Sequence, residues 1–261
     1  MKVFGKGILM LGIDLGSRTV KMVIMNADYE IMSANKFDTV DFYRRYSRQT
    51  SSGLCIDLTG LGIAAGEQIV STGYGRLAVQ VEGAVNVPEI QAHALGAVQQ
   101  TGLTDFTLVD IGGQDTKIIK IRSGQVADFM TNDRCAASSG RYLENMAAVI
   151  GVDLATMGQY YQNPIELNST CAVFGETEII AHIVEGVDTP ALVAGVNYSL
   201  FKRFSFMLDK LLSDIVVMSG GVALNQALAC ILEKEKPVQI VPLIHPQLNG
   251  ALGCCVYGLQ H

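Results

Sequence analysis

Two segments of the sequence combine an acidic residue with glycines at the end of an apolar run. The first is Asp14-Leu-Gly-Ser-Arg-Thr, and the second runs from Asp110 through Gly112-Gly113-Gln114-Asp115-Thr116. A turn of glycines and hydroxyl side chains presents backbone N–H groups to an anion, which suits the β- or γ-phosphate of a nucleotide. The carboxylate of Asp14 is placed to hold Mg²⁺ directly or through water. The two segments therefore predict a site for a triphosphate and its metal.

The second segment also carries groups suited to hydrolysis. Asp110 or Gln114 could orient the attacking water, because phosphoryl transfer depends mainly on positioning and charge neutralisation. A glycine pair, Gly220-Gly221, follows a third apolar run and would let the backbone approach an adenosine. Neither acidic segment fits a Walker loop or a dinucleotide-binding fingerprint. The alternative is that each segment is an ordinary turn, but three of them at the ends of apolar runs favour the nucleotide site.

Two cysteines, Cys135 and Cys171, each come shortly before a stretch with helical spacing. A helix N-terminus stabilises a thiolate, and the thiolate is the form that binds metal. Two cysteines cannot complete a four-cysteine site, but a symmetric dimer could supply four to one [4Fe–4S] cluster. The alternative is that both are small buried hydrophobes, the commonest role of a free cysteine. No role is predicted for Cys55, which is expected in a loop, nor for Cys230, Cys254 and Cys255.

The acidic turns belong to two similar patterns of strands. Residues 11–25 and 108–121 each form two apolar strands around the turn, and each pattern continues through a polar turn into a third strand-like run. A further buried strand is predicted within residues 214–221. Helical spacing follows these strands, over residues 88–98, 140–150, 176–185, 191–212 and 222–232.

Strands followed by helices, twice over, indicate an α/β protein with two similar lobes. We expect the first lobe to comprise residues 1–100, completed by a C-terminal helix over 246–261. The second lobe would comprise residues 101–245. Because no linker separates the lobes, a cleft between them is expected.

Composition excludes several other classes of protein. With 49% hydrophobic residues and a net charge of −6, the chain is not disordered and lacks the basic excess of a nucleic-acid binder. No run reaches the roughly 20 apolar residues of a membrane helix. The apolar run near Met1 has no signal-peptide cleavage site. We therefore expect a soluble cytoplasmic protein that binds neither membranes nor nucleic acid.

The three glycine segments resemble the phosphate-1, phosphate-2 and adenosine motifs of the superfamily of actin, sugar and acetate kinases and heat-shock chaperone ATPases. This resemblance implies two ribonuclease-H-like lobes with the nucleotide in the cleft. A second resemblance lies around the cysteines. The segments Asp133-Arg-Cys-Ala-Ala-x-x-Gly-Arg141 and Cys171-x-Val-Phe-x-Glu-x-Glu178 resemble the cluster-ligand segments of ATP-dependent activators of 2-hydroxyacyl-CoA dehydratases, in the BadF/BadG/BcrA/BcrD family. The segments Ser71–Arg76, Glu89–Ala94 and Pro246–Gly253 are similar to that family too.

This second resemblance implies an ATP-hydrolysing activator that forms a homodimer. One [4Fe–4S] cluster, held by Cys135 and Cys171 of both subunits, would accept an electron from reduced ferredoxin or flavodoxin. The protein would deliver it to an (R)-2-hydroxyacyl-CoA dehydratase or a related acyl-CoA or aromatic-CoA reductase. The implied catalytic residues are Asp14, Asp110, Gln114 and Asp115. The residues implied to bind ATP or ADP with Mg²⁺ are Gly16, Ser17, Arg18, Thr19, Val20, Lys21, Gly112, Gly113, Arg141, Gly220, Gly221 and Gln247.

The chain departs from the family pattern at two places. Ser138-Ser139 stands where the family usually has Gly-Thr, and Phe174-Gly-Glu-Thr-Glu178 stands where it usually has Phe-Ala-Glu-Ser-Glu. Loss of a glycine beside a cluster ligand could alter the hydrogen bonds that tune the potential of the cluster.

The alternative function is a sugar or carboxylic-acid kinase, with Asp110 as general base and both cysteines in the core. A third is a nucleotide-binding scaffold.

Overall fold

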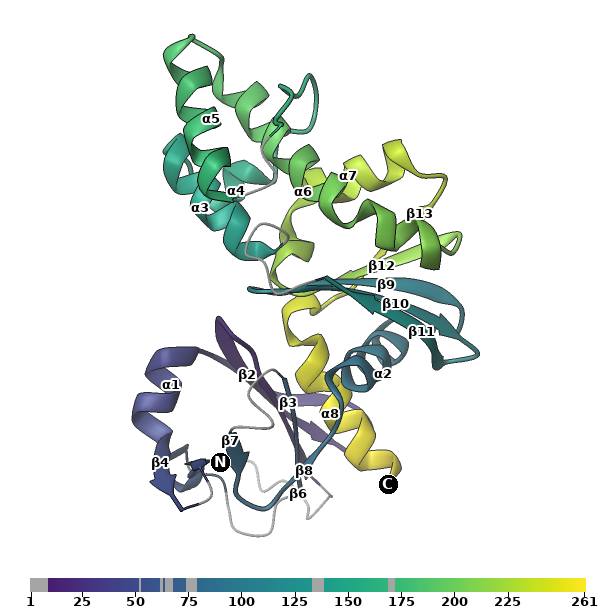
Figure 1. Cartoon of the computed structure of the whole chain (residues 1–261). Coiled ribbons are helices and arrows are strands. Elements are labelled where there is room, and N and C mark those ends of the chain that lie inside the picture. The colour runs from purple at the N-terminus through teal and green to yellow at the C-terminus, as the bar shows by residue number, and fades with distance from the viewer. Residues whose placement is uncertain are drawn as a thin grey trace. The chain divides into compact units, whose positions relative to one another are not determined.

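The computed structural model describes residues 9–51, 53–61, 63, 68–73, 79–132, 139–168 and 172–261. The chain divides into two compact units (Figure 1). The first contains the described residues of Met1–Leu103 together with Gln247–His261, and the second contains those of Thr104–Pro246.

The first unit is built on a meander of three antiparallel strands, β1 (Leu9–Leu15), β2 (Thr19–Asn26) and β3 (Ile31–Asp38). Two further strands, β6 (Gln68–Thr72) and β8 (Ala84–Asn86), extend the sheet in the order β3-β2-β1-β6-β8. Strand β6 runs parallel to β1, and β8 runs parallel to β6. Strand β1 is buried from Met10 onward because it lies in the middle of this sheet.

Helices α2 (Glu89–Thr101) and α8 (Asn249–Gln260) pack against each other, and α8 also packs against β1 and β6. Glycines permit this close approach. A Cβ atom on Gly253 would lie 1.7 Å from the carbonyl oxygen of Ala92, and one on Gly12 would lie 2.0 Å from that of Ala251. The C-terminal helix therefore belongs to the core of the first unit, and its contacts fix the position of β1.

The rest of the first unit contains helix α1 and a small sheet. Helix α1 (Thr39–Tyr46) is capped by Asp38 and buries Phe42. The remaining elements are β4 (Ser47–Thr50), β5 (Gly53–Ile56), the 3₁₀ turn η1 (Thr59–Leu61) and β7 (Val79–Val81), with the three strands forming one sheet. Cys55, expected in a loop, is instead buried in β5, because this short strand pairs with both β4 and β7.

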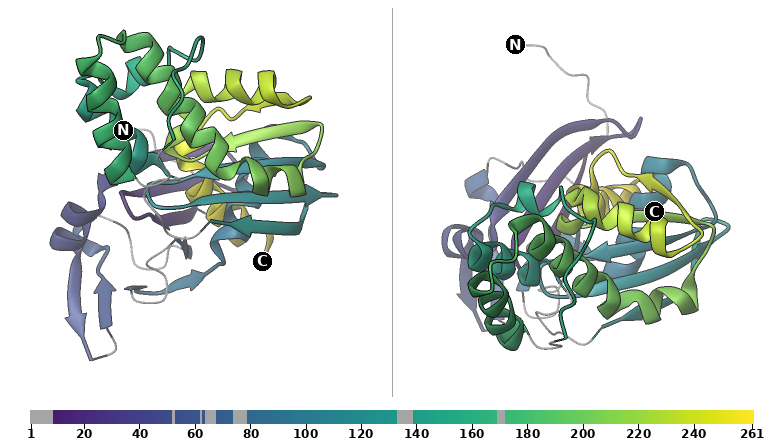
Figure 2. Two further views of the ribbon diagram at one scale, coloured as in Figure 1. Left: turned by 45° about the horizontal axis from the view of Figure 1, so that its top comes forward. Right: turned by 90° about the horizontal axis from the view of Figure 1, so that it is seen from above.

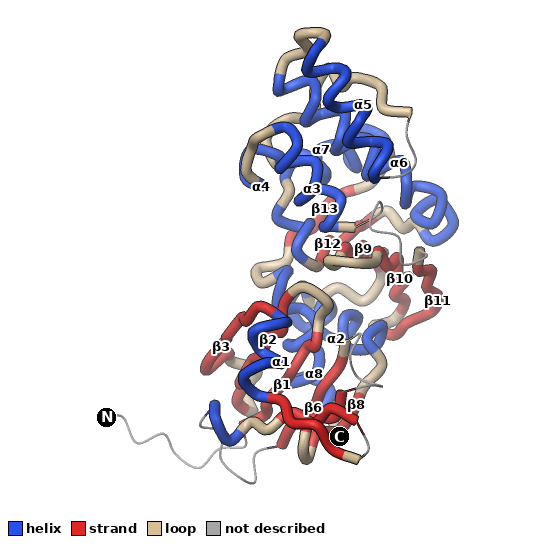
Figure 3. Tube along the Cα trace, turned by 60° about the vertical axis from the view of Figure 1, so that its left-hand side comes forward, coloured by secondary structure: helices blue, strands red, loops and turns tan. Residues whose placement is uncertain are grey.

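The second unit repeats the sheet of the first. Its meander consists of β9 (Phe106–Ile111), β10 (Thr116–Arg122) and β11 (Gln125–Thr131), joined by β12 (Ile215–Ser219) and β13 (Gln239–Pro242). The order β11-β10-β9-β12-β13 reproduces β3-β2-β1-β6-β8, and β12 runs parallel to both of its neighbours. Within the second unit, helix α3 packs against α5 and α6, and α6 packs against α7 (Figures 2 and 3). Its helices are α3 (Gly140–Ile150), α4 (Leu154–Met157), α5 (Ala172–Val184), α6 (Thr189–Leu211) and α7 (Gln226–Glu235).

The predicted fold class is confirmed: the chain has an α/β fold of two ribonuclease-H-like units. One predicted element is wrong in detail. Residues 222–232 were expected to form one helix, but the 3₁₀ turn η4 (Gly221–Leu224) precedes α7. The reason is Asn225, whose side chain accepts a hydrogen bond from the N–H of Leu228 and so starts a new helix. A last 3₁₀ turn, η5 (Pro246–Leu248), leads into α8.

Candidate nucleotide site

The first acidic residue, Asp14, forms a buried cross-strand pair with a lysine. Asp14 lies near the end of β1, directly opposite Lys21 on β2. Lys21 Nζ is 3.1 Å from Asp14 Oδ2, and the aspartate is only 3% exposed. A buried carboxylate is costly unless it is paired, and Lys21 provides the opposite charge. A Cβ atom on Gly16 would lie 2.9 Å from Lys21 Nζ, so the glycine leaves room for the ammonium group beside the turn.

The second acidic residue, Asp110, repeats this arrangement. Asp110 lies near the end of β9, directly opposite Lys117 on β10. Lys117 Nζ is 3.6 Å from Asp110 Oδ2 and 2.8 Å from Asp115 Oδ1, so a single ammonium group is shared by two carboxylates. On the other side, the buried hydroxyl of Ser219 donates a hydrogen bond of 2.6 Å to Asp110 Oδ1. The two oxygens of Asp110 are thereby held by different partners.

The correspondence extends to the parallel neighbour of each acidic strand. Asp14 is in register with Thr72 on β6, and Asp110 is in register with Ser219 on β12. A glycine with positive φ follows each hydroxyl residue: Gly73 at 108° and Gly220 at 84°. These backbone angles favour glycine. In addition, a Cβ atom on Gly220 would lie 2.3 Å from the carbonyl oxygen of Ile111. Each unit thus has an acidic residue with a lysine, a hydroxyl residue and a glycine at corresponding positions, and we call these sets the acidic stations: Asp14, Lys21, Thr72 and Gly73, and Asp110, Lys117, Ser219 and Gly220. They differ in one contact, because the Thr72 hydroxyl donates to the carbonyl oxygen of Val87 and not to the aspartate.

Further groups surround Asp14 within the first unit. Gly250 is at the start of α8, where a Cβ atom would lie 2.9 Å from His93 Nε2 and 3.2 Å from Asp14 Oδ2. Burial raises the pKa of the Tyr43 phenol, and the negative charge of Asp14 raises it further. The pKa of the Cys254 thiol is raised well above its usual value, again by burial first and then by Asp14. Both groups thus stay neutral near the carboxylate.

The turns that follow the acidic residues have the same length, since Leu15 pairs with Val20 and Ile111 with Thr116, but they make different contacts. In the second unit, Gly112 N–H donates to the carbonyl oxygen of Asp115 at 2.9 Å and closes a tight turn that includes Gln114. We call residues Gly112–Asp115 the second loop. In the first unit, Arg18 is exposed and lies 3.9 Å from Asp38. Ser17 and Arg18 follow Gly16 in this turn, and Thr19, Val20 and Lys21 already belong to β2.

The other predicted nucleotide-binding residues differ in their burial and in their contacts. The side chain of Val20 is fully buried in the apolar core, so only its backbone is available to a ligand. Gln247 accepts a hydrogen bond of 3.2 Å from Lys36 Nζ within the first unit. Arg141 is exposed in the first turn of α3, and Gly221 begins η4.

Cys135 and Cys171 lie outside the described residues. Helix α5 begins at Ala172, the residue after Cys171, and α3 begins at Gly140, five residues after Cys135. Because α3 and α5 pack together, the two cysteines precede neighbouring helices of one unit. Cys171 comes directly before its helix and Cys135 five residues before; thiols near helix N-termini are suited to binding metal as thiolates, and this donor type fits an iron–sulfur cluster. Among the described residues, no group of three or more His, Cys, Asp or Glu is arranged to hold a metal ion.

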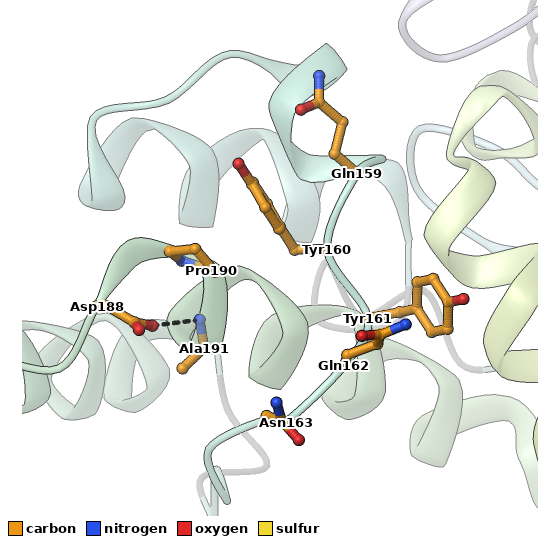
Figure 4. A pocket seen from close by; sticks show the side chains of 8 residues that line it. All are labelled: Gln159, Tyr160, Tyr161, Gln162, Asn163, Asp188, Pro190 and Ala191. Carbon is orange, nitrogen blue, oxygen red and sulfur yellow. Dashed lines mark hydrogen bonds between the residues drawn. The ribbon is translucent and has the colours of Figure 1, made fainter.

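A cavity of about 370 Å³ lies elsewhere in the second unit (Figure 4). It is formed by the loop after α4 and the start of α6, where Asp188 caps the helix by accepting from Ala191 N–H at 2.9 Å. None of the predicted site residues line it. Its lining residues are Gln159, Tyr160, Tyr161, Gln162, Asn163, Asp188, Pro190 and Ala191.

Four residues of the acidic stations were not among the sequence candidates: Thr72, Gly73, Lys117 and Ser219. Lys117 could have been found, because it follows Asp110 by seven residues as Lys21 follows Asp14. Ser219 gave no such signal. Its partner Asp110 is 109 residues away, and only the parallel pairing of β9 and β12 brings the two together.

The chain belongs to the BadF/BadG/BcrA/BcrD ATPase family, whose model matches residues 11–258. The 2-hydroxyisocaproyl-CoA dehydratase activator of Clostridioides difficile is 34% identical over 258 residues, which cover 96% of this chain and 94% of that protein. The (R)-2-hydroxyglutaryl-CoA dehydratase activating ATPase of Acidaminococcus fermentans is 33% identical, with 97% of this chain and 98% of that protein covered.

A solved structure shares the fold over nearly its whole length. The activator of the 2-hydroxyisocaproyl-CoA dehydratase from Clostridium difficile with bound ADPNP superposes with a TM-score of 0.82 at 31% identity, covering 97% of this chain and 94% of that one. The predicted family is thus confirmed.

No described helix is both long and apolar enough to cross a membrane.

Proposed function

We propose that this protein is an ATP-hydrolysing activator that delivers a low-potential electron to a partner enzyme. The partner would be an (R)-2-hydroxyacyl-CoA dehydratase or a related acyl-CoA or aromatic-CoA reductase. The observation that carries the proposal is the duplicated acidic station, with its lysine, hydroxyl and glycine, in a chain of an ATPase family. The names of the relatives, both of them dehydratase activators, support the choice of partner.

In this proposal each acidic station contributes groups that bind Mg²⁺ and the phosphates of a nucleotide. Carboxylate oxygens are the ligands that Mg²⁺ prefers, which assigns Asp14 and Asp110 to the metal and its waters. Lys21 and Lys117 add fixed positive charge near the phosphates, where negative charge must be neutralised during transfer. Gly113 and Gln114 offer backbone N–H groups to the γ-phosphate, whereas the N–H of Gly112 is bound to the carbonyl oxygen of Asp115 and shapes the turn. The glycines at 220 and 221, with Gln247, would border the adenosine.

The attacking water is assigned to Asp110 or Gln114. Asp110 is the better held of the two, because Ser219 binds one of its oxygens and Lys117 lies near the other. A carboxylate fixed in this way can orient water at little cost in reorganisation. Asp115 takes part indirectly, since its contact with Lys117 holds the ammonium group between the two carboxylates.

We further propose that Cys135 and Cys171 of two subunits hold one [4Fe–4S] cluster in a homodimer. The cluster, when bound, supplies a one-electron carrier of low potential. Reduced ferredoxin or flavodoxin would provide the electron. The role of this chain is to hold the thiolates at the starts of α3 and α5 and to let ATP hydrolysis bias their position.

The proposal is tested by ATP hydrolysis in anaerobically purified protein. We expect Mg²⁺-dependent hydrolysis without any added phosphoryl acceptor, reduced about 100-fold or more in Asp14→Asn and Asp110→Asn. Asp209→Asn is the matched control, because Asp209 is an exposed aspartate paired with Lys236. Absence of hydrolysis, or ATP consumption only with a sugar or carboxylic acid that becomes phosphorylated, would contradict the proposal and favour the kinase alternative.

A further inference from the structure

Ser139 stands at the N-cap position of α3, yet its side chain makes no hydrogen bond to that helix. Serine is a preferred N-cap because its oxygen normally accepts a bond from an N–H group in the first turn. Here the fully buried Ser139 hydroxyl instead donates to the carbonyl oxygen of Gly113, at 3.1 Å. This hydroxyl connects the start of α3 to the second loop.

The next residue, Gly140, strengthens the same connection. Its N–H donates to the carbonyl oxygen of Gly112 at 2.8 Å. A Cβ atom at this position would lie 3.0 Å from that oxygen and 3.3 Å from Val222 Cγ2, so a larger residue would press the helix away from the loop. Two consecutive carbonyl groups of the second loop are therefore bound by two consecutive residues at the start of α3.

Each of these carbonyl groups belongs to a planar peptide group. The same peptide groups contain the N–H groups that bind the γ-phosphate in our proposal. The carbonyl of Gly112 shares one planar peptide with the N–H of Gly113, and the carbonyl of Gly113 shares one with the N–H of Gln114. If either N–H rotates when the γ-phosphate leaves, its carbonyl must rotate too. The start of α3 then either follows the loop or loses its hydrogen bonds.

The first unit contains a related contact that serves as a natural comparison. Thr39, buried at the start of α1, donates a hydrogen bond of 2.8 Å to the carbonyl oxygen of Gly16. Helix α1 follows the meander of its unit as α3 follows that of the second unit. No cysteine lies between the third strand and α1, whereas Cys135 lies between β11 and α3.

We propose that Ser139 and Gly140 are positioning residues that couple the second loop to α3. Through them the bound nucleotide sets the position of the first turn of α3, which begins five residues after Cys135. This inference rests on the proposed function, because it requires a nucleotide at the second loop. It assigns the coupling to a hydroxyl and a backbone N–H at the start of α3.

The test is hydrogen–deuterium exchange of the α3 peptide in the full-length protein, with Mg²⁺–ADP and with a non-hydrolysable ATP analogue. We expect the amides of the first turn of α3 to exchange several-fold more slowly with the analogue than with ADP. Ser139→Ala should remove this difference, and Ser139→Thr, which keeps the hydroxyl, should restore it. Thr39→Ala should leave the difference at α3 as in the wild type, although it removes the related contact in the first unit.

Nucleotide binding and thermal unfolding of each variant are measured on the same samples, so that three results can be told apart. A Ser139→Ala variant that binds both nucleotides and keeps the wild-type difference at α3 overturns the coupling. A wild-type protein that binds both nucleotides with equal exchange at α3 overturns it as well, while leaving the ATPase proposal intact. A wild-type protein that binds no nucleotide overturns the proposed function and, with it, this inference.

Discussion

The hydroxyl of Ser219 and the carboxylate of Asp110 form a hydrogen bond of 2.6 Å inside the second unit, between residues that are 109 positions apart. Both side chains are almost completely buried. The bond follows from sheet topology, because β9 and β12 run parallel and place the two residues in register. Asp110 is therefore held in one orientation before any ligand arrives, and the hydroxyl becomes a testable part of the proposed ATPase site.

Ser219→Ala should lower the rate of ATP hydrolysis about tenfold, with little change in the affinity for the nucleotide. A hydrogen bond to a charged group contributes roughly 1.5–3 kcal/mol, and a tenfold change in rate corresponds to about 1.4 kcal/mol. Ser219→Thr should recover most of the activity because it keeps the hydroxyl. Unchanged turnover in Ser219→Ala would show that Asp110 does not depend on this partner.

Lys117→Met should abolish most of the hydrolysis, by about 100-fold. The substitution leaves Asp110 and Asp115 without the ammonium group that lies 3.6 Å from one and 2.8 Å from the other. The control is Lys120→Met on the same strand, whose ammonium group binds only the carbonyl oxygen of Leu212 at 3.3 Å among the contacts described. Steady-state kinetics should separate the two variants clearly. Equal losses in both would point to a general effect on the sheet.

Substitution by alanine should have different effects on stability and nucleotide binding at two glycines of α8. In Gly253→Ala the new Cβ atom would lie 1.7 Å from the backbone oxygen of Ala92, so the helices must separate. We expect a loss of about 3 kcal/mol or more in the free energy of unfolding, measured with urea. In Gly250→Ala the closest atoms are side-chain atoms of His93 and Asp14, which can shift. That variant should remain folded and bind Mg²⁺–ATP more weakly. A Gly250→Ala variant that loses stability but keeps its affinity for Mg²⁺–ATP would contradict the placement of Asp14 in the proposed site.

Cys255 should make the protein less stable at alkaline pH. Burial raises the pKa of its thiol to about 12, and the sulfur contacts the carbonyl oxygens of Met10 and Val23. Below the ordinary thiol pKa of about 8.5, both the folded and the unfolded chain are protonated. Between about 8.5 and 12 only the unfolded chain ionises, so stability falls as the pH rises.

The measurement is the free energy of unfolding at pH 8 and pH 10 for the wild type and Cys255→Ser. The variant should lose less stability over this interval, by about 2 kcal/mol, because serine does not ionise there. Identical losses in the two proteins would show that the Cys255 thiol ionises in the folded state.

Local patterns predicted the elements of this fold better than the contacts between them. Helix α3 lies at the predicted residues 140–150, because its apolar spacing and Gly151, at a positive φ after the last turn, are both local signals. The small sheet of β4, β5 and β7 was not predicted, since strands of three or four residues carry too little periodicity.

For the candidate site, too, local patterns predicted single segments better than the contacts between them. Both acidic turns and their glycines could be identified from residue types and spacing, and Lys21 was implied by the family resemblance. The hydroxyl of Ser139 could not be predicted, because no local pattern marks it. Its bond to Gly113 depends on how the start of α3 meets the second loop, 26 residues earlier in the chain. The roles of Cys135 and Cys171 remain predictions from the sequence.

The central claim is most directly tested by measuring iron and acid-labile sulfide per polypeptide in anaerobically purified protein. We expect about two irons and two sulfides per chain, as for one four-iron cluster shared by two subunits. Both should be lost in Cys135→Ser and in Cys171→Ser, and kept in Cys230→Ser, which replaces a free cysteine of α7. No iron after anaerobic reconstitution, or iron that persists in both cysteine variants, would contradict the account.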